Sequence, residues 1–108
     1  MSQVIVNGEG AQTFLFAHGA GAGMDHDFMT RVAEGISEHG IRVVRFNFPY
    51  MVKRSEDGKK RPPDRAPKLL EAFEEMIERY SDGSLVIGGK SMGGRMASLL
   101  SESPHIQG

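Results

Sequence analysis

Short apolar runs alternate with segments of helical periodicity along almost the whole chain. Apolar runs of strand length occur at 13–18, 41–48 and 85–89, and a shorter extended piece covers Val4 to Val6. Apolar residues recur at helical spacing in the segments 28–36, 69–80 and 92–100. Strands and helices therefore alternate, and each helix must bury its apolar stripe against the sheet before the next strand begins.

This alternation predicts an α/β fold, a three-layer α/β/α sandwich with a mostly parallel sheet. Gly40 is expected just past the end of the first helix, Asp25 is a candidate cap at its start, and Asp27 lies in its first turn. Pro49 closes the second long strand. A polar loop is expected from there to the helix that begins near Pro67, where proline is tolerated.

Composition limits the classes of function that the chain can have. Its 108 residues, 39% hydrophobic and 25% charged, are typical of one small globular domain or part of one. A net charge of -1 gives no general attraction to nucleic acid or to an anionic membrane, so we expect neither as a partner. The absence of cysteine fits a reducing compartment, and no signal peptide or membrane-spanning segment is recognised. We therefore expect a cytoplasmic protein.

The pentapeptide Gly89-Lys90-Ser91-Met92-Gly93 lies between an apolar strand and an amphipathic helix. A serine hydroxyl is a poor nucleophile, and a tight turn from strand to helix presents it to a base and to an approaching carbonyl group. Glycines two residues before and after Ser91 leave room for such a turn. We predict that Ser91 is the nucleophile of a hydrolase, and that the N–H group of Met92 faces the developing oxyanion.

A second glycine-rich segment, His18-Gly19-Ala20-Gly21-Ala22-Gly23, directly follows the first buried strand. Serine hydrolases with a nucleophile turn of this kind carry their second oxyanion donor on a loop at this place in the order of elements. With both motifs, the sequence resembles the α/β-hydrolase superfamily, especially its small dienelactone-hydrolase-like branch and a related group of compact predicted hydrolases with HGAG-type loops and GKSMGG elbows. The likeness covers nearly the whole chain.

This resemblance implies that Ser91 is the nucleophile and that the amides of Met92 and Ala20 form the oxyanion hole, with Gly21 the less favoured second donor. The implied substrate is a small acyl compound with an ester-like bond, namely a carboxylester, thioester or lactone. No metal or organic cofactor is implied. The second group is also similar to the hydrolase-like domain of a chromatin acetyltransferase-complex subunit, so a noncatalytic interaction module is the alternative function.

In this superfamily the triad acid and histidine follow the serine, on loops after later strands. Glu102 and His105 satisfy that order, but Glu102 lies about 16 Å from Ser91 along a helix, and both are expected to point away from the elbow. We therefore expect residues 1–108 to be the N-terminal portion of a single α/β-hydrolase domain, truncated after the nucleophile helix and inactive or incomplete without the acid and base. The strand that ends at Gly89 would then have an unpaired apolar edge, through which a homo-oligomer can form.

None of the upstream histidines is assigned to a triad. His18 is expected to anchor the glycine loop by hydrogen bonds to the backbone, and His26 and His39 are expected on the surface of a helix. Lys90 and Arg95, which flank the nucleophile, are expected to be solvated.

Two nucleotide-binding patterns are incomplete in this chain. A P-loop needs a glycine five residues before Gly89, where Ser84 stands. The dinucleotide fingerprint that begins at Gly19-Ala20-Gly21 lacks its third glycine, because Met24 occupies that position. The alternative for the glycines around Ser91 is that they merely permit tight packing about an inert serine.

The segment from Lys53 to Arg61 is rich in basic side chains. Such a segment is most often a solvated, flexible loop. It follows the carboxyl end of a strand, on the side where active sites gather in parallel sheets, so the alternative is that it attracts an anionic substrate or partner.

Overall fold

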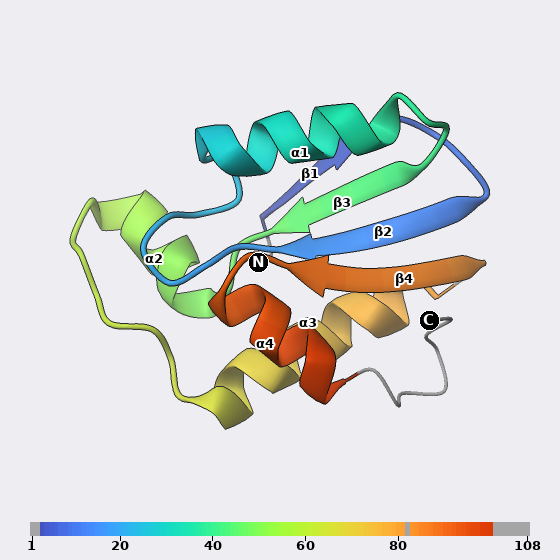
Figure 1. The fold of residues 1–108 in the computed structure, drawn as a ribbon. Helices are drawn as coiled ribbons and strands as arrows, with labels where there is room; N and C mark the ends of the chain where they lie inside the picture. Colours follow the sequence, from blue (N-terminus) through green and yellow to red (C-terminus); the bar gives the residue numbers. More distant parts are fainter. Residues whose placement is uncertain (1–2, 82, 101–108) are drawn as a thin grey trace.

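The computed structural model describes residues 3–81 and 83–100 of the chain. The elements follow in the order β1 (Val4–Asn7), β2 (Gln12–Ala17), α1 (Asp27–Ser37), β3 (Arg42–Phe46), α2 (Pro49–Asp57), α3 (Ala66–Arg79), β4 (Ser84–Gly89) and α4 (Met92–Leu99). The strands form a sheet in the order β1-β3-β2-β4 (Figure 1). Strand β2 runs parallel to both β3 and β4, and β1 pairs antiparallel with β3, so the sheet is mostly parallel as predicted.

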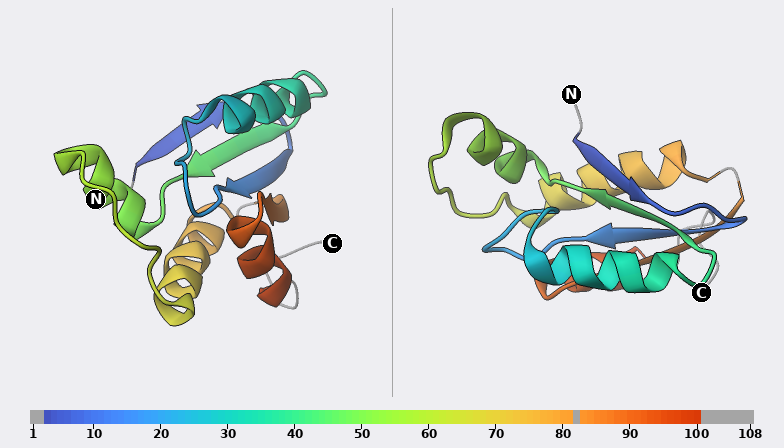
Figure 2. Two further views of the ribbon diagram at one scale, coloured as in Figure 1. Left: turned by 60° about the vertical axis from the view of Figure 1, so that its left-hand side comes forward. Right: turned by 90° about the horizontal axis from the view of Figure 1, so that it is seen from above.

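Apolar side chains cover both faces of the sheet, because helices pack against each face. One cluster joins the sheet to α3 and α4 and includes Leu15, Val44, Phe73, Leu85 and Met96. The other joins the sheet to α1 and consists of Phe16, Met29, Ala33 and Val43. Figure 2 shows α1 on one side of the sheet and the pair α3 and α4 on the other. The fold is therefore the predicted three-layer α/β/α sandwich.

Helix α3 follows its sequence pattern closely. Its buried residues recur at helical spacing and form one stripe that faces the sheet: Leu69, Phe73, Met76 and Ile77. Burying each of these side chains contributes about 1.5–3 kcal/mol, so a stripe of this kind is enough to direct a helix onto a sheet. Among the helices of the described segments, none combines the length and apolar character needed to cross a membrane.

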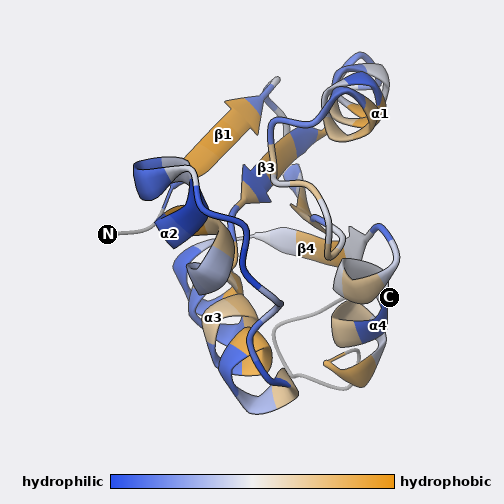
Figure 3. Cartoon of the chain, turned by 90° about the vertical axis from the view of Figure 1, so that its left-hand side faces the viewer, coloured by the Kyte–Doolittle hydropathy of each residue, from blue (hydrophilic) through white to orange (hydrophobic). Residues whose placement is uncertain are grey.

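Residues 49–57, which the sequence pattern assigns to a polar loop, form helix α2, so this prediction was wrong. Within the helix only Tyr50 and Met51 are buried, and Figure 3 shows α2 as mainly hydrophilic. An apolar stripe this short does not stand out as a helical period. The helix ends at Gly58, which adopts a left-handed φ of 71°, so the basic segment 53–61 begins in a helix and only its second part is a loop.

The start of α1 also differs from the prediction. The N-cap is His26, whose Nδ1 accepts a hydrogen bond from the N–H group of Phe28 at 3.3 Å, and Asp25 lies one residue too early to be the cap. Asp27 lies in the first turn, as predicted. His26 and His39 are predicted to lie on the surface of a helix. Both are exposed, but they lie outside the ends of α1.

Strand β4 lies at an edge of the sheet. Among the described strands it pairs with β2 alone. Leu85 faces the core, whereas Val86 and Ile87 are half-buried. Within the described residues, the strand that leads to Ser91 therefore has the unpaired edge that the sequence predicts.

Candidate active site

Ser91 lies in the turn between β4 and α4, in a backbone conformation that is uncommon for any residue except glycine. Its φ is 53° and its ψ is -112°, and no other non-glycine residue in the described chain has a positive φ. Such strain costs on the order of 1–3 kcal/mol and persists only where the surroundings hold it. Strain of this kind concentrates at functional sites, and it agrees with the predicted nucleophile turn.

Two glycines allow this turn to pack closely against the sheet. A Cβ atom added to Gly93 would lie 2.5 Å from the carbonyl oxygen of His18 and 2.6 Å from that of Ala17. A Cβ atom added to Gly89 would lie 2.5 Å from the carbonyl carbon of Gly93. Backbone atoms cannot move aside as the end of a flexible side chain can, so the glycine spacing is a requirement of packing the strand against the helix.

Hydrogen bonds join the turn to the end of β2. The N–H group of Lys90 donates to the carbonyl oxygen of Ala17 at 3.0 Å, and the N–H group of Gly93 donates back to Lys90 at 3.0 Å. Met92 is the first residue of α4, so its N–H group is one of the first-turn amides that have no acceptor within the helix. An amide in this position can stabilise a negative charge that develops beside Ser91.

The glycine-rich loop after β2 runs directly beside Ser91. A Cβ atom added to Gly19 would lie 3.3 Å from the carbonyl oxygen of Lys90 and 3.5 Å from Cβ of Ser91. A cavity of about 320 Å³ opens here, lined by Gly19, Ala20, Gly21, Ala22, His26, Met29, Lys90 and Ser91. The structure thus brings the two motifs together around one cavity, as their order in the sequence predicts.

His18 is fully buried under this loop. Its Nε2 accepts a hydrogen bond from the N–H group of Phe48 at 3.0 Å, and its Nδ1 lies 2.6 Å from the carbonyl oxygen of Gly19. Since Nε2 accepts, the neutral ring carries its proton on Nδ1 and donates it to Gly19. Burial lowers the pKa of His18, although the hydrogen bond to Gly19 acts in the opposite direction. Both ring nitrogens are engaged, so His18 anchors the loop, as predicted.

Helix α2 holds the same loop through two side chains that the sequence pattern did not single out. The hydroxyl group of Tyr50 donates to the carbonyl oxygen of Ala20 at 2.9 Å and lies 3.3 Å from that of Gly19. Nη1 of Arg54 donates to the carbonyl oxygen of Gly21 at 3.2 Å. The four-residue spacing of Tyr50 and Arg54, which places two side chains on one face of a helix, is the signal that could have found them.

Among the described residues, no acid and base join Ser91 in a triad. Glu102 and His105 lie outside the described residues. In the described part of the chain, no side chain is hydrogen-bonded to the hydroxyl group of Ser91. His26 lines the cavity beside Ser91, but its Nδ1 is used to cap α1.

Charged side chains around the site are partly engaged with neighbours. Nζ of Lys90 lies 4.9 Å from the centre of the Phe28 ring, which is a cation–π contact. Lys90 is therefore not only solvated, as the sequence predicts, but also in contact with an aromatic ring.

In the basic segment, Arg61 donates to Asp57 at 2.9 Å and lowers the pKa of Asp57 to about 2. This pair is exposed and adds little stability. Arg54 is the basic residue of that segment that reaches the glycine loop.

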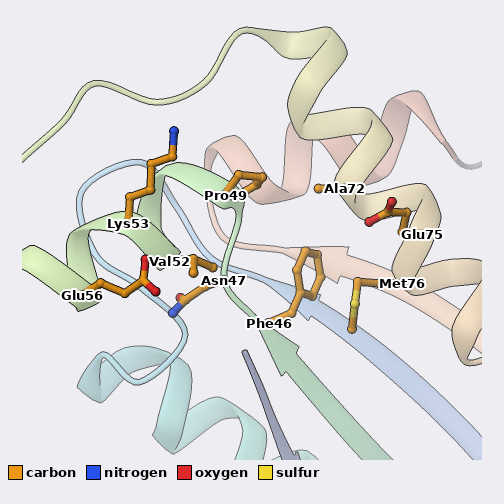
Figure 4. Close-up of a pocket in the computed structure, with 9 residues that line it drawn as sticks. All are labelled: Phe46, Asn47, Pro49, Val52, Lys53, Glu56, Ala72, Glu75 and Met76. Carbon is orange, nitrogen blue, oxygen red and sulfur yellow. The ribbon is translucent and has the colours of Figure 1, made fainter. Parts of the chain in front are cut away.

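Two other cavities lie away from Ser91. One of about 430 Å³ opens between α2 and α3, where Figure 4 shows Lys53 and Glu56 on one side and Glu75 and Met76 on the other. Another of about 740 Å³ lies between the start of α1 and α2. Ser91 lines neither of them. No group of three or more histidine, aspartate or glutamate side chains that could hold a metal ion occurs in the described ranges.

The family model described as an alpha/beta hydrolase domain matches residues 10–108, whereas no curated protein matches the chain. An α/β serine hydrolase homologue from Coxiella burnetii is 20% identical with a TM-score of 0.69, over 95% of this chain and 52% of that one. An α/β serine hydrolase without a lid from Xanthomonas campestris is 23% identical with a TM-score of 0.71, over 89% and 48%. Est1E from Butyrivibrio proteoclasticus, solved with ferulic acid bound, is 15% identical with a TM-score of 0.75, over 93% and 43%.

The chain therefore spans about half the length of these solved structures. At such low identities the structural likeness establishes the fold alone. The family match covers nearly all of the sequence, including both glycine-rich motifs and the serine turn. This chain belongs to the α/β-hydrolase domain family.

Proposed function

We propose that this chain carries the nucleophile half of a serine hydrolase that cleaves an ester-like bond, a carboxylester, thioester or lactone, in a small acyl substrate. Ser91 attacks the carbonyl carbon, and the amides of Ala20 and Met92 stabilise the oxyanion. A histidine from a later segment takes the serine proton and passes it to the leaving group, and water then releases the acid. This chemistry needs no metal or organic cofactor.

The strained backbone of Ser91 beside the glycine loop is the observation that carries this proposal. A serine that only fills a tight turn gains nothing from a positive φ, which costs free energy. An exposed serine next to a cavity lined by the glycine loop can instead use that conformation for catalysis. The serine hydrolases among the similar solved structures are consistent with this reaction class.

In this proposal, residues 1–108 are the N-terminal portion of a longer domain, and the acid and the histidine follow them in the chain. We also propose a cytoplasmic location, which the absence of cysteine suits. A homo-oligomer can form through the edge of β4, because its backbone groups have no partner on one side among the described strands.

The test is hydrolysis and active-site labelling by the complete domain. A panel of p-nitrophenyl esters, acyl thioesters and lactones reports turnover, and a fluorophosphonate probe reports a reactive serine. We expect the wild type to be labelled and active, and Ser91→Ala to lose both properties by at least about 1000-fold. Ser98→Ala is the control, since this serine is exposed on the same helix, and it should behave like the wild type.

The interaction module is the other outcome of the same experiment. If neither the wild type nor Ser91→Ala shows turnover or labelling, and Ser91→Ala keeps the biological role of the protein, the serine turn is a remnant in a binding domain. Retained turnover in Ser91→Ala would also reject Ser91 as the nucleophile.

A further inference from the structure

Three successive carbonyl groups of the glycine loop accept hydrogen bonds from buried or helical side chains. His18 donates to Gly19, and Tyr50 donates to Ala20 while lying within reach of Gly19. Arg54 donates to Gly21. Tyr50 is only 3% exposed and does not line the cavity beside Ser91, so its hydroxyl group binds the loop from within the protein and not from that cavity.

The direction of these carbonyl groups sets the direction of the loop amides. In a trans peptide the N–H group points opposite to the C=O group of the same peptide unit, and no cis peptide occurs in the described chain. The bond from His18 to Gly19 therefore turns the N–H group of Ala20 away from the protein interior. The bond from Tyr50 to Ala20 does the same for the N–H group of Gly21.

Tyr50 is itself held firmly in place. Its N–H group donates to Oδ2 of Asp64 at 2.9 Å, and its ring lies edge-on to the His18 ring with 5.9 Å between centroids. Burial and the nearby Asp64 carboxylate raise the pKa of Tyr50 to about 12, so the hydroxyl group remains a donor at any physiological pH. A rigid donor of this kind restricts a loop that would otherwise be flexible because of its glycines.

We propose that Tyr50 is a positioning residue for the acyl-transfer reaction: its hydroxyl group donates to the Ala20 carbonyl, lies within reach of the Gly19 carbonyl, and so fixes the two peptides that flank Ala20 with the Ala20 amide facing the oxyanion position beside Ser91. This inference rests on the proposed function. Oxyanion donors work because they are oriented before charge develops, and a small misplacement is enough to lower the rate strongly. Tyr50 thus acts through the loop and not by contact with the substrate.

The experiment is Tyr50→Phe in the complete domain, with Tyr80→Phe as the matched control. Tyr80 is the other tyrosine of the chain; it lies at the end of α3, where the Arg42 guanidinium stacks on its ring. We expect Tyr50→Phe to lower kcat by at least about 10-fold and to change KM by less than about twofold. A boronic acid inhibitor, which forms a tetrahedral anion on the serine, should lose affinity by the same factor as kcat, because it needs the same amides. Hydrogen exchange of the loop amides should become faster.

Tyr80→Phe should leave all of these values at the wild-type level. The proposal is overturned if Tyr50→Phe, folded as judged by circular dichroism, keeps the wild-type kcat and boronic acid affinity. It is also overturned if kcat and labelling fall only in proportion to the folded fraction, since that marks a purely structural role. Failure of the proposed function looks different, because Ser91→Ala would then be as active as the wild type.

Discussion

The glycines on both sides of Ser91 matter as much as its hydroxyl group, because they have no side chains. Ser91 adopts a φ of 53°, and the glycines on both sides of it lie against carbonyl groups of the turn and of β2. A side chain at either glycine would push the helix away from the sheet and move the serine out of its turn. At the scale of single residues, the turn at Ser91 therefore depends on the absence of a side chain at Gly89 and Gly93. Substitution of these glycines tests how much the close packing contributes to the free energy of unfolding.

Gly93→Ala is the sharpest test of this space. The added Cβ atom would lie 2.5 Å and 2.6 Å from two carbonyl oxygens, so strand and helix must separate, and we expect the free energy of unfolding to fall by about 1–3 kcal/mol or more. Gly35→Ala is the control, because nothing lies within 4 Å of its added Cβ atom in α1, and it should stabilise the protein by about 0.5–1 kcal/mol. Urea unfolding measures both. Equal stability of Gly93→Ala and the wild type would contradict the close packing described.

Helix α2 is the element that connects the glycine loop to the rest of the structure. It has 9 residues, and a helix of this length is not stable by itself in water. Its N-cap, Phe48, has no side chain that can accept from the first turn. Asp64, from the segment after the helix, supplies the missing acceptor to the N–H group of Tyr50 at 2.9 Å. Tertiary contacts therefore decide whether this segment is helical.

Asp64→Ala should destabilise the domain by about 1 kcal/mol, because the first turn of α2 loses its capping carboxylate. The control is Lys68→Ala, which removes the 3.7 Å ion pair of Asp64 and keeps the cap. Lys68 is largely exposed, so we expect a change of no more than about 0.5 kcal/mol. Thermal or urea unfolding compares the two variants. If both lower stability equally, the ion pair and not the cap explains the role of Asp64.

At the scale of the whole molecule, the described strands form a four-stranded sheet with β4 at one edge. The chain spans about half the length of the similar solved structures, from 43 to 52% of those cited. Ser91 has no acid or base hydrogen-bonded to it among residues 3–81 and 83–100. A nucleophile without a general base reacts slowly.

We therefore expect the 108-residue chain by itself to have little or no ester turnover and to react poorly with a fluorophosphonate probe. The complete domain should react faster by at least about 100-fold, in line with the usual contribution of general base catalysis. The measurement is the labelling rate of each protein, with Ser91→Ala as the background. Rapid, Ser91-dependent labelling of the 108-residue chain together with ester turnover would show that this chain already contains a working base.

Most of the fold could be predicted from the sequence. Long apolar runs and regular helical stripes, such as the buried face of α3, depend on the spacing of residues along the chain. They can therefore be recognised before the tertiary packing is known. The same holds for the serine turn and the glycine loop, because their glycines mark strand ends that a parallel sheet must bring to one edge. The sequence by itself thus determined the α/β sandwich and the pair of motifs that meet at Ser91.

Only the tertiary structure decided how that pair is held. Helix α2 forms because Tyr50 and Met51 are buried and Asp64 caps its first turn. These interactions do not produce a hydrophobic period in the sequence. The cap at His26 and the hydrogen bond from Phe48 to His18 likewise cannot be predicted from the spacing of apolar residues. Hydrophobic periodicity records which face of an element is buried, whereas a hydrogen bond between distant segments depends on where the folded chain places them.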